Sequence, residues 1–197
     1  MKKIIIVSFL LVCSMHTFGQ TDKEVNLIEA NSTWGKEIIQ VPFWFAPKID
    51  YKGYEDIRFA KGWEEIDSSG FWTLAFAWDI NLETKPTLKF FEDNLKLYYD
   101  GLMKVVNEDS TLTVPKTKTF FIENDIKEGT TTFTGTLETY DAFTTKKMIV
   151  LHVTIESYYC EKSNRYIPLF KFSPKNFKHK IWKQLSRIKL QDTICNH

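Results

Sequence analysis

The spacing of apolar residues predicts one long helix near the middle of the chain. Between Pro86 and Val106, apolar side chains recur at intervals of three and four residues, the period of an amphipathic helix. The repeating positions are Leu88, Phe91, Leu95, Tyr98, Leu102 and Val105. Thr84 can cap this helix, and Pro86 suits its first turn. We expect this helix to be a main element of the core.

Two strands are predicted before this helix. Residues 38–45 are rich in β-branched and aromatic side chains, and Pro42, which has no backbone N–H, places them at a sheet edge or a bulge. In residues 71–80 the even positions are large and apolar, whereas the odd positions are mostly small. The large face should pack on the core, and the small face should lie close to a helix or another backbone. Residues 50–70 are interrupted by glycines and serines and are predicted to be irregular.

Four strands and a second helix are predicted after the long helix. The strand segments are 117–123, 130–140, 148–158 and 166–172. Their connections are short and polar, which indicates an antiparallel meander. Ser173 and Pro174 then suit the N-cap and first position of a last helix. Its inward side chains would be Phe177, Ile181, Trp182, Leu185 and Ile188.

This order of elements predicts an α+β fold. It consists of two strands, a helix, a four-strand meander and a helix, so we expect an antiparallel sheet of about six strands with helices packed on it. The order resembles that of the Mog1/PsbP-like fold. That resemblance concerns the succession of elements alone and implies no activity.

The first 19 residues are typical of a secretory signal peptide. Lys2 and Lys3 precede the apolar run Ile4 to Val12, and small residues flank Phe18 at the expected cleavage site. Cleavage would leave residues 20–197 as a single domain, exported to the periplasm or outside the cell. The alternative is a lipoprotein anchored through Cys13, although the bulky side chain of Val12 argues against lipid attachment.

The charge balance argues against polyanionic partners. Removing Lys2 and Lys3 leaves 24 basic residues against the 25 acidic ones of the full chain. A near-neutral chain of this kind has no field that would favour nucleic acid or an acidic membrane. The basic residues near the end of the chain are expected on a solvated helix face: Lys175, Lys178, Lys180, Lys183 and Arg187. No second apolar run approaches membrane length, so no transmembrane segment is expected in the mature chain.

The common catalytic, metal and cofactor motifs are absent from the sequence. There is no G-x-S-x-G, H-E-x-x-H, P-loop or dinucleotide fingerprint, so we expect no metal site and no cofactor. The histidines of the mature chain, His152, His179 and His197, fall on separate elements and are interpreted as surface or hydrogen-bonded side chains. Cys160 and Cys195 form no CxxC motif and have no adjacent histidine, so they are predicted to form a disulfide that pins the C-terminal tail.

Aromatic residues are concentrated between Trp34 and Trp78, a stretch that holds five of the six tryptophans. Within it, the string from Tyr51 to Trp63 is the most distinctive part. It is interpreted either as a loop stapled by its own aromatics and an Asp56–Arg58 ion pair, or as a ligand surface. The candidate ligand-binding residues are Trp44, Tyr51, Tyr54, Asp56, Arg58 and Trp63. If the string is a ligand surface, we expect at least one of Trp44, Tyr51, Tyr54 and Trp63 to be exposed beside Asp56 or Arg58.

Three short strings carry a second resemblance. They are W-G-K-E at 34–37, F-x-F-A-P at 43–47 and Y-x-G-x-E-D-x-R-F-A-x-G-W at 51–63. Together they resemble sequences among uncharacterised secreted bacterial proteins over residues 34–80. This resemblance implies secretion and brings no established activity.

Three classes of function are compatible with these observations. The leading hypothesis is a secreted, non-catalytic binding or accessory module whose ligand is a glycan or another apolar-faced molecule. The alternative is an exported, glycosidase-like hydrolase, which needs two carboxyls at one cleft. Its candidate carboxylates are Asp50, Glu55, Asp56, Glu64, Glu65 and Asp67. The third is an envelope protein that contacts another protein through a broad apolar patch.

Overall fold

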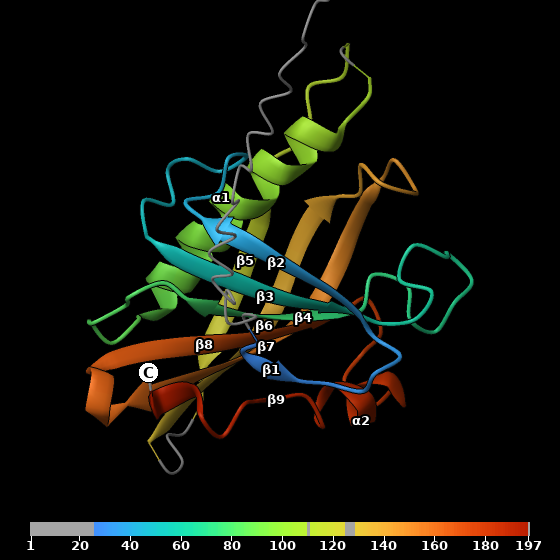
Figure 1. Ribbon diagram of the computed structural model, residues 1–197. Coiled ribbons are helices and arrows are strands. Elements are labelled where there is room, and N and C mark those ends of the chain that lie inside the picture. Colours follow the sequence, from blue (N-terminus) through green and yellow to red (C-terminus); the bar gives the residue numbers. More distant parts are fainter. Residues whose placement is uncertain (1–25, 110, 125–128, 197) are drawn as a thin grey trace, which may run out of the picture.

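The computed structural model describes residues 26–109, 111–124 and 129–196 (Figure 1). The predicted signal peptide and Cys13 lie outside these residues. Within them the predicted α+β class is confirmed: seven antiparallel strands form one sheet in the order β2-β3-β4-β8-β7-β6-β5. The strands are β2 (Gly35–Val41), β3 (Gly53–Phe59), β4 (Leu74–Asp79), β5 (Lys118–Glu123), β6 (Thr130–Tyr140), β7 (Met148–Cys160) and β8 (Arg165–Ser173).

The two faces of the sheet are covered by different elements. The long helix α1 (Leu88–Val106) packs on one face. The other face carries the start and the end of the described chain. These parts are β1 (Ile28–Glu29), paired with β9 (Lys189–Leu190), together with α2 (Ile181–Leu185) and η2 (Ile194–Asn196); the short helix η1 (Glu161–Ser163) connects β7 to β8. None of the helices in the described ranges is long and apolar enough to cross a membrane.

Strand β4 lies between the two cores, as its alternation predicts. Phe76 and Trp78 are fully buried in the cluster under α1. Ala75 and Ala77 point the other way and are buried against the terminal segments. Their small side chains let those segments approach the sheet closely.

The predicted meander is confirmed. Strands β5, β6, β7 and β8 are sequential antiparallel neighbours, and β6 has the predicted bounds. Helix α1 begins slightly later than predicted, because Thr87 and not Thr84 is its N-cap: the Thr87 hydroxyl accepts a hydrogen bond from the Phe90 N–H at 3.2 Å. Val105, predicted to face inward, is exposed on this helix.

The prediction that residues 50–70 are irregular was wrong for its first half, which contains β3. The hydrophobic pattern hides this strand because three of its buried side chains are polar: Glu55, Asp56 and Arg58. Each has hydrogen-bond partners inside the protein, which is what permits a polar residue to be buried. The strand therefore lacks the apolar alternation used to recognise strands.

The first predicted strand, 38–45, was placed too far along the chain. Strand β2 ends at Val41, and the Val41–Pro42 bond is cis. Pro42 does mark a sheet edge, because β2 is the outermost strand at its end of the sheet. The residues after it turn away and bury Phe43 and Phe45 against α1.

The long helix predicted after Ser173 was also wrong, since α2 has only five residues. Side chains here accept hydrogen bonds from backbone N–H groups that a helix would otherwise use. The Ser173 hydroxyl accepts a hydrogen bond from the Lys175 N–H, and the Asn176 side chain accepts one from the Lys178 N–H. Such local bonds favour turns over a helix. Phe177 is consequently exposed, whereas the predicted burial of Ile181, Leu185 and Ile188 is confirmed.

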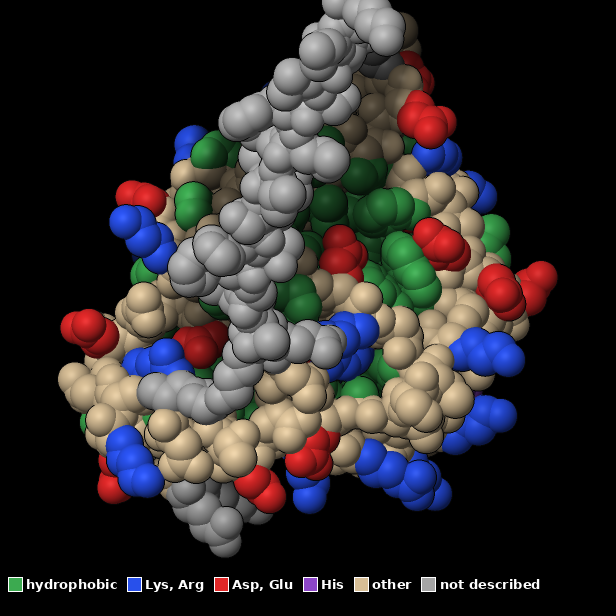
Figure 2. All heavy atoms as spheres, viewed as in Figure 1, with side chains coloured by type: hydrophobic (Ala, Val, Ile, Leu, Met, Phe, Trp, Pro, Cys, Tyr) green, Lys and Arg blue, Asp and Glu red, His purple; other side chains and the backbone are tan. Residues whose placement is uncertain are grey.

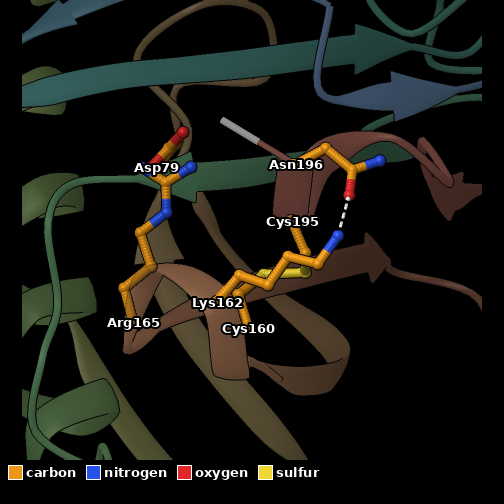
Figure 3. The surroundings of a disulfide bond; sticks show 6 residues. All are labelled: Asp79, Cys160, Lys162, Arg165, Cys195 and Asn196. Atoms are coloured by element: carbon orange, nitrogen blue, oxygen red, sulfur yellow. Dashed lines mark hydrogen bonds and ion pairs between the residues drawn. A yellow bond between two sulfur atoms is a disulfide. The ribbon is translucent and has the colours of Figure 1, made fainter.

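The predicted disulfide between Cys160 and Cys195 is confirmed, with 5.1 Å between the α-carbons. It ties the end of β7 to the C-terminal tail (Figure 3). Close to it, the Lys162 ammonium donates to the Asn196 side chain at 3.1 Å. The tail is therefore held to the sheet covalently and by a polar contact.

Candidate functional site

A pocket of about 270 Å³ lies between the sheet and the second half of α1. Most of its lining residues are aromatic or aliphatic: Ile39, Trp44, Phe45, Ile57, Phe59, Trp63, Trp72, Leu74, Phe76, Tyr98, Tyr99, Leu102, Val106 and Phe143, with Glu37 as the one charged residue among the described lining. Figure 2 shows hydrophobic side chains gathered in a hollow on this face, with acidic side chains at its margin.

The turn after β2 supplies one wall of the pocket. Phe45 lies 5.0 Å from Tyr98 of α1, edge to face, and Trp44 stands beside it with 72% of its surface exposed. This turn approaches the helix closely because residue 101 is glycine. A Cβ atom at Gly101 would lie 2.1 Å from the carbonyl oxygen of Phe45. Helix and turn are thus packed backbone to backbone, with Trp44 at the rim.

The connection between β3 and β4 supplies a second wall. The backbone N–H of Trp72 donates to the backbone carbonyl of Trp63 at 2.8 Å. The two indole rings lie edge to face in the pocket lining. Trp72 has φ of 46°, in the left-handed region, where a non-glycine residue costs about 1–3 kcal/mol. Its buried indole N–H has no acceptor among the described residues. Such strain and an orphaned donor are features that gather at functional sites.

The β6–β7 hairpin supplies the third wall through Phe143. The buried Asp141 carboxylate accepts hydrogen bonds from the backbone N–H groups of Phe143, Thr144 and Thr145 at 2.7–3.0 Å. These bonds fix the hairpin so that the Phe143 ring lies 5.6 Å from Trp63. The pocket is therefore built from parts of the chain that are far apart in sequence.

A fully buried carboxyl group lies next to the pocket. In the sheet, Glu55 lies opposite Ile39 of β2 and opposite Trp78 of β4. Its two oxygens accept hydrogen bonds from the Trp78 indole N–H at 2.6 Å and the Tyr98 hydroxyl at 2.8 Å. Burial raises the pKa of Glu55 to about 8; these two hydrogen bonds oppose the rise, and the negative charge of Glu37 adds to it. The group is therefore mostly protonated at neutral pH.

The next residue, Asp56, points to the opposite face of the sheet. Its carboxylate pairs with the Arg58 guanidinium and accepts hydrogen bonds from the backbone N–H groups of Leu27 and Ile28 at 2.8 and 3.2 Å. Arg58 also donates to the Asn26 side chain and the Ile28 carbonyl. The predicted ion pair is thus present, but it fastens the N-terminal segment to the sheet and does not staple a loop on itself.

The six predicted ligand-binding residues do not come together at one place. Trp44 and Trp63 line the pocket. Asp56 and Arg58 lie buried on the other face, and Tyr54, 44% exposed, shares that face because side chains alternate along β3. Tyr51 packs against Phe90, with 6.0 Å between the ring centroids. Glu37, Trp72, Tyr98, Tyr99 and Phe143 were not predicted as site residues. Glu37 and Trp72 belong to the aromatic-rich stretch from Trp34 to Trp78, which could have marked them as candidates, whereas no sequence pattern marked Phe143.

The remaining chemical candidates do not gather into a centre. Of the carboxylates considered for hydrolysis, Asp50, Glu64, Glu65 and Asp67 are exposed in turns. His152 contacts the ring of Phe177, and the His179 side chain accepts a hydrogen bond from the Ile181 N–H, whereas His197 lies outside the described residues. Across the described ranges no three His, Cys, Asp or Glu side chains are placed to hold a metal ion.

No family model matches this chain, and no curated protein and no solved structure matches it. The resemblances noted in the sequence therefore stay predictions. Function has to be inferred from the geometry of the pocket itself.

Proposed function

We propose that this protein is an exported, non-catalytic binding protein that holds a small apolar-faced ligand in the pocket beside α1. The observation that carries the proposal is an aromatic pocket of about 270 Å³ with the exposed indole of Trp44 at its rim. Ligand pockets are typically concave, mostly apolar and provided with a few polar groups.

The lining favours an apolar ligand over a glycan. A sugar presents many hydroxyl groups, and each needs a hydrogen-bond partner once it leaves water. Apart from Glu37 and the tyrosine hydroxyls, the described lining is hydrocarbon or aromatic ring. A glycan is thus the weaker of the two ligand classes that the aromatic composition suggests.

Export is supported by the Cys160–Cys195 disulfide. Disulfides persist in oxidising compartments and are uncommon in the cytosol. The signal-peptide pattern in the first 19 residues leads to the same proposal from independent features of the sequence.

An exported hydrolase fits this geometry less well. Two carboxyls would have to face one cleft across a scissile bond. Glu37 does line the pocket, but Glu55 is fully buried, with both oxygens bonded to Trp78 and Tyr98. That arrangement supports binding better than proton transfer to a substrate.

A protein-binding role is the second candidate. Phe120 and Ile122 on the edge strand β5 are 66% and 52% exposed. Their neighbours across β6 on the same face are Thr136 and Thr134. The apolar side chains are thus separated by threonines, which interrupt the apolar surface that a protein partner would cover.

The test is a thermal-shift screen of the mature protein with small apolar compounds and soluble glycans. We expect apolar compounds to raise the melting temperature of the wild-type protein and to lose that effect in Trp44→Ala. Phe120→Ala, which removes an exposed ring from the opposite edge of the sheet, is the matched control and should respond like wild type. Stabilisation by glycans alone, or stabilisation unchanged in Trp44→Ala, would refute the proposal.

A further inference from the structure

The aromatic rings that line the pocket impose an electrostatic preference of their own. The face of an aromatic ring carries partial negative charge and attracts cations, most strongly in tryptophan. Trp44 comes from the turn after β2, Trp63 and Trp72 come from the connection between β3 and β4, and Tyr98 and Tyr99 line the pocket from α1. The Nε1 atom of Trp72 is itself buried, so its N–H is not among the polar groups that a ligand in the pocket can reach.

The formal charge at the pocket has the same sign. Glu37 is the charged residue among the described lining, and it lies on the edge strand β2 opposite Ile57, with its side chain exposed. The nearest basic residues in the sheet, Lys36 and Arg58, alternate to the opposite face. No lysine or arginine is among the described residues that line the pocket.

These features discriminate between three kinds of apolar ligand. A fatty acid would bring a carboxylate towards Glu37 without meeting a basic side chain of the described lining. A neutral molecule would bury its apolar surface but would gain nothing from Glu37. A cation on an apolar body would contact the ring faces and place its charge near the Glu37 carboxylate.

We infer that the pocket selects organic cations, in which an ammonium group is carried on a small apolar body. This inference rests on the proposed function, because it assumes that the pocket binds a small molecule. The surroundings of Glu55, which is bonded to the Tyr98 hydroxyl, agree with this preference. The described hydrogen-bond partners of its carboxyl group are two neutral donors, so no buried cation accompanies it that would repel a cationic ligand.

The test uses three compounds that share a hexyl chain and differ in the head group: hexyltrimethylammonium, hexan-1-ol and hexanoate. Isothermal titration calorimetry on the mature protein measures the affinity of each one. We expect the ammonium compound to bind about 5- to 30-fold more tightly than hexan-1-ol, the range that follows from a cation–π contact with partial desolvation. Hexanoate should bind more weakly than the alcohol.

Two variants separate the charge of Glu37 from the ring faces. Glu37→Gln should weaken binding of the ammonium compound about threefold, as expected for one exposed ion pair, and leave hexan-1-ol unchanged. Glu29→Gln, which removes an exposed carboxylate on the other face of the sheet, is the control and should bind like wild type. Trp44→Phe should retain more of the ammonium preference than Trp44→Leu, because phenylalanine keeps an aromatic face.

The outcomes distinguish this inference from the proposed function. If hexan-1-ol or hexanoate binds as tightly as the ammonium compound, the cation preference is wrong and the binding function stands. The same conclusion follows if none of the three binds while other apolar compounds stabilise the protein in the thermal-shift screen. Absence of any binding in both experiments overturns the proposed function and this inference together.

Discussion

Strand β3 presents two adjacent carboxyl groups, Glu55 and Asp56, that are both fully buried but have opposite surroundings. Asp56 pairs with the guanidinium of Arg58 and with two backbone N–H groups of the N-terminal segment. Glu55 meets two neutral donors, the Trp78 indole and the Tyr98 hydroxyl. One face of the strand therefore pairs its buried carboxylate with a cation, whereas the other face buries a carboxyl group that meets only these neutral donors among its described partners.

The difference separates a face that fastens a chain segment from the face on which we propose that the ligand binds. A buried carboxylate matched by a guanidinium fixes the position of a chain segment, because removing either partner leaves an uncompensated charge. A buried carboxyl without a cation is held protonated by desolvation, and burial raises the pKa of Glu55 to about 8. It lies beside a pocket, whereas Asp56 lies under the segment that it fastens.

The largest expected effect comes from breaking the compensated pair. Asp56→Asn leaves the buried Arg58 guanidinium without its carboxylate and should destabilise the protein by about 3–5 kcal/mol. Urea unfolding of the mature protein measures this change. Asp50→Asn, at an exposed position, is the control and should alter stability by less than about 0.5 kcal/mol. A loss below about 1 kcal/mol in Asp56→Asn would mean that the pair is not needed to hold β1.

The disulfide should be nearly as important to the same face. Replacing both Cys160 and Cys195 by serine opens a loop with a sequence separation of 35 residues. The chain-entropy account expects a loss of about 3–4 kcal/mol. Binding at the pocket should be unchanged, because the two cysteines lie on the opposite side of the sheet. A variant that keeps its full stability in urea, or that loses ligand affinity while folded, contradicts this separation.

The pH dependence of stability should distinguish the two faces further. The pKa of Glu55 is raised from 4.5 to about 8 on folding, so between these values the folded state holds a proton that the unfolded state has released. The contribution of this group is fully present below pH 4.5 and is lost as pH rises towards 8. Stability of the wild type relative to Glu55→Gln should therefore fall by about 1 kcal/mol per pH unit across this window. A relative stability that rises with pH would show that the two hydrogen bonds outweigh burial.

The smallest change in stability is expected at the rim of the pocket. Trp44 is 72% exposed, so Trp44→Ala should alter the free energy of unfolding by less than about 1 kcal/mol. The same substitution should abolish ligand-induced stabilisation. A large loss of stability would place Trp44 among the structural residues, and its effect on binding would then be indirect.

The spacing of apolar residues predicted the elements in which apolar side chains are buried at regular intervals. Helix α1 and strands β5 to β8 are recognisable because apolar side chains recur with the period of each element. Strand β3 was missed because Glu55, Asp56 and Arg58 are buried as hydrogen-bonded groups, and their partners come from distant parts of the chain. The last helix was overestimated because local side-chain bonds to the backbone favour turns after Ser173.

The pocket could be predicted only in part for the same reason. Trp44 and Trp63 were recognisable from the density of aromatic residues, and both line the pocket. Asp56 and Arg58 lie on the opposite face of the sheet from these tryptophans, and this separation could not be foreseen because it follows from the alternation of a strand that was not recognised. Phe143 reaches the pocket through a hairpin whose position depends on the whole sheet, so no local pattern could have revealed it.

The six tryptophans provide a direct test of the division between the two faces. Trp44, Trp63 and Trp72 line the pocket, whereas Trp34 and Trp182 lie with the terminal segments on the opposite face. The measurement is a titration of the ¹⁵N-labelled mature protein with hexyltrimethylammonium, observed at the indole N–H resonances. We predict shifts at Trp44, Trp63 and Trp72 and unchanged resonances at Trp34 and Trp182. Shifts concentrated at Trp34 and Trp182, or none at the three pocket indoles, would contradict the assignment of binding to this face.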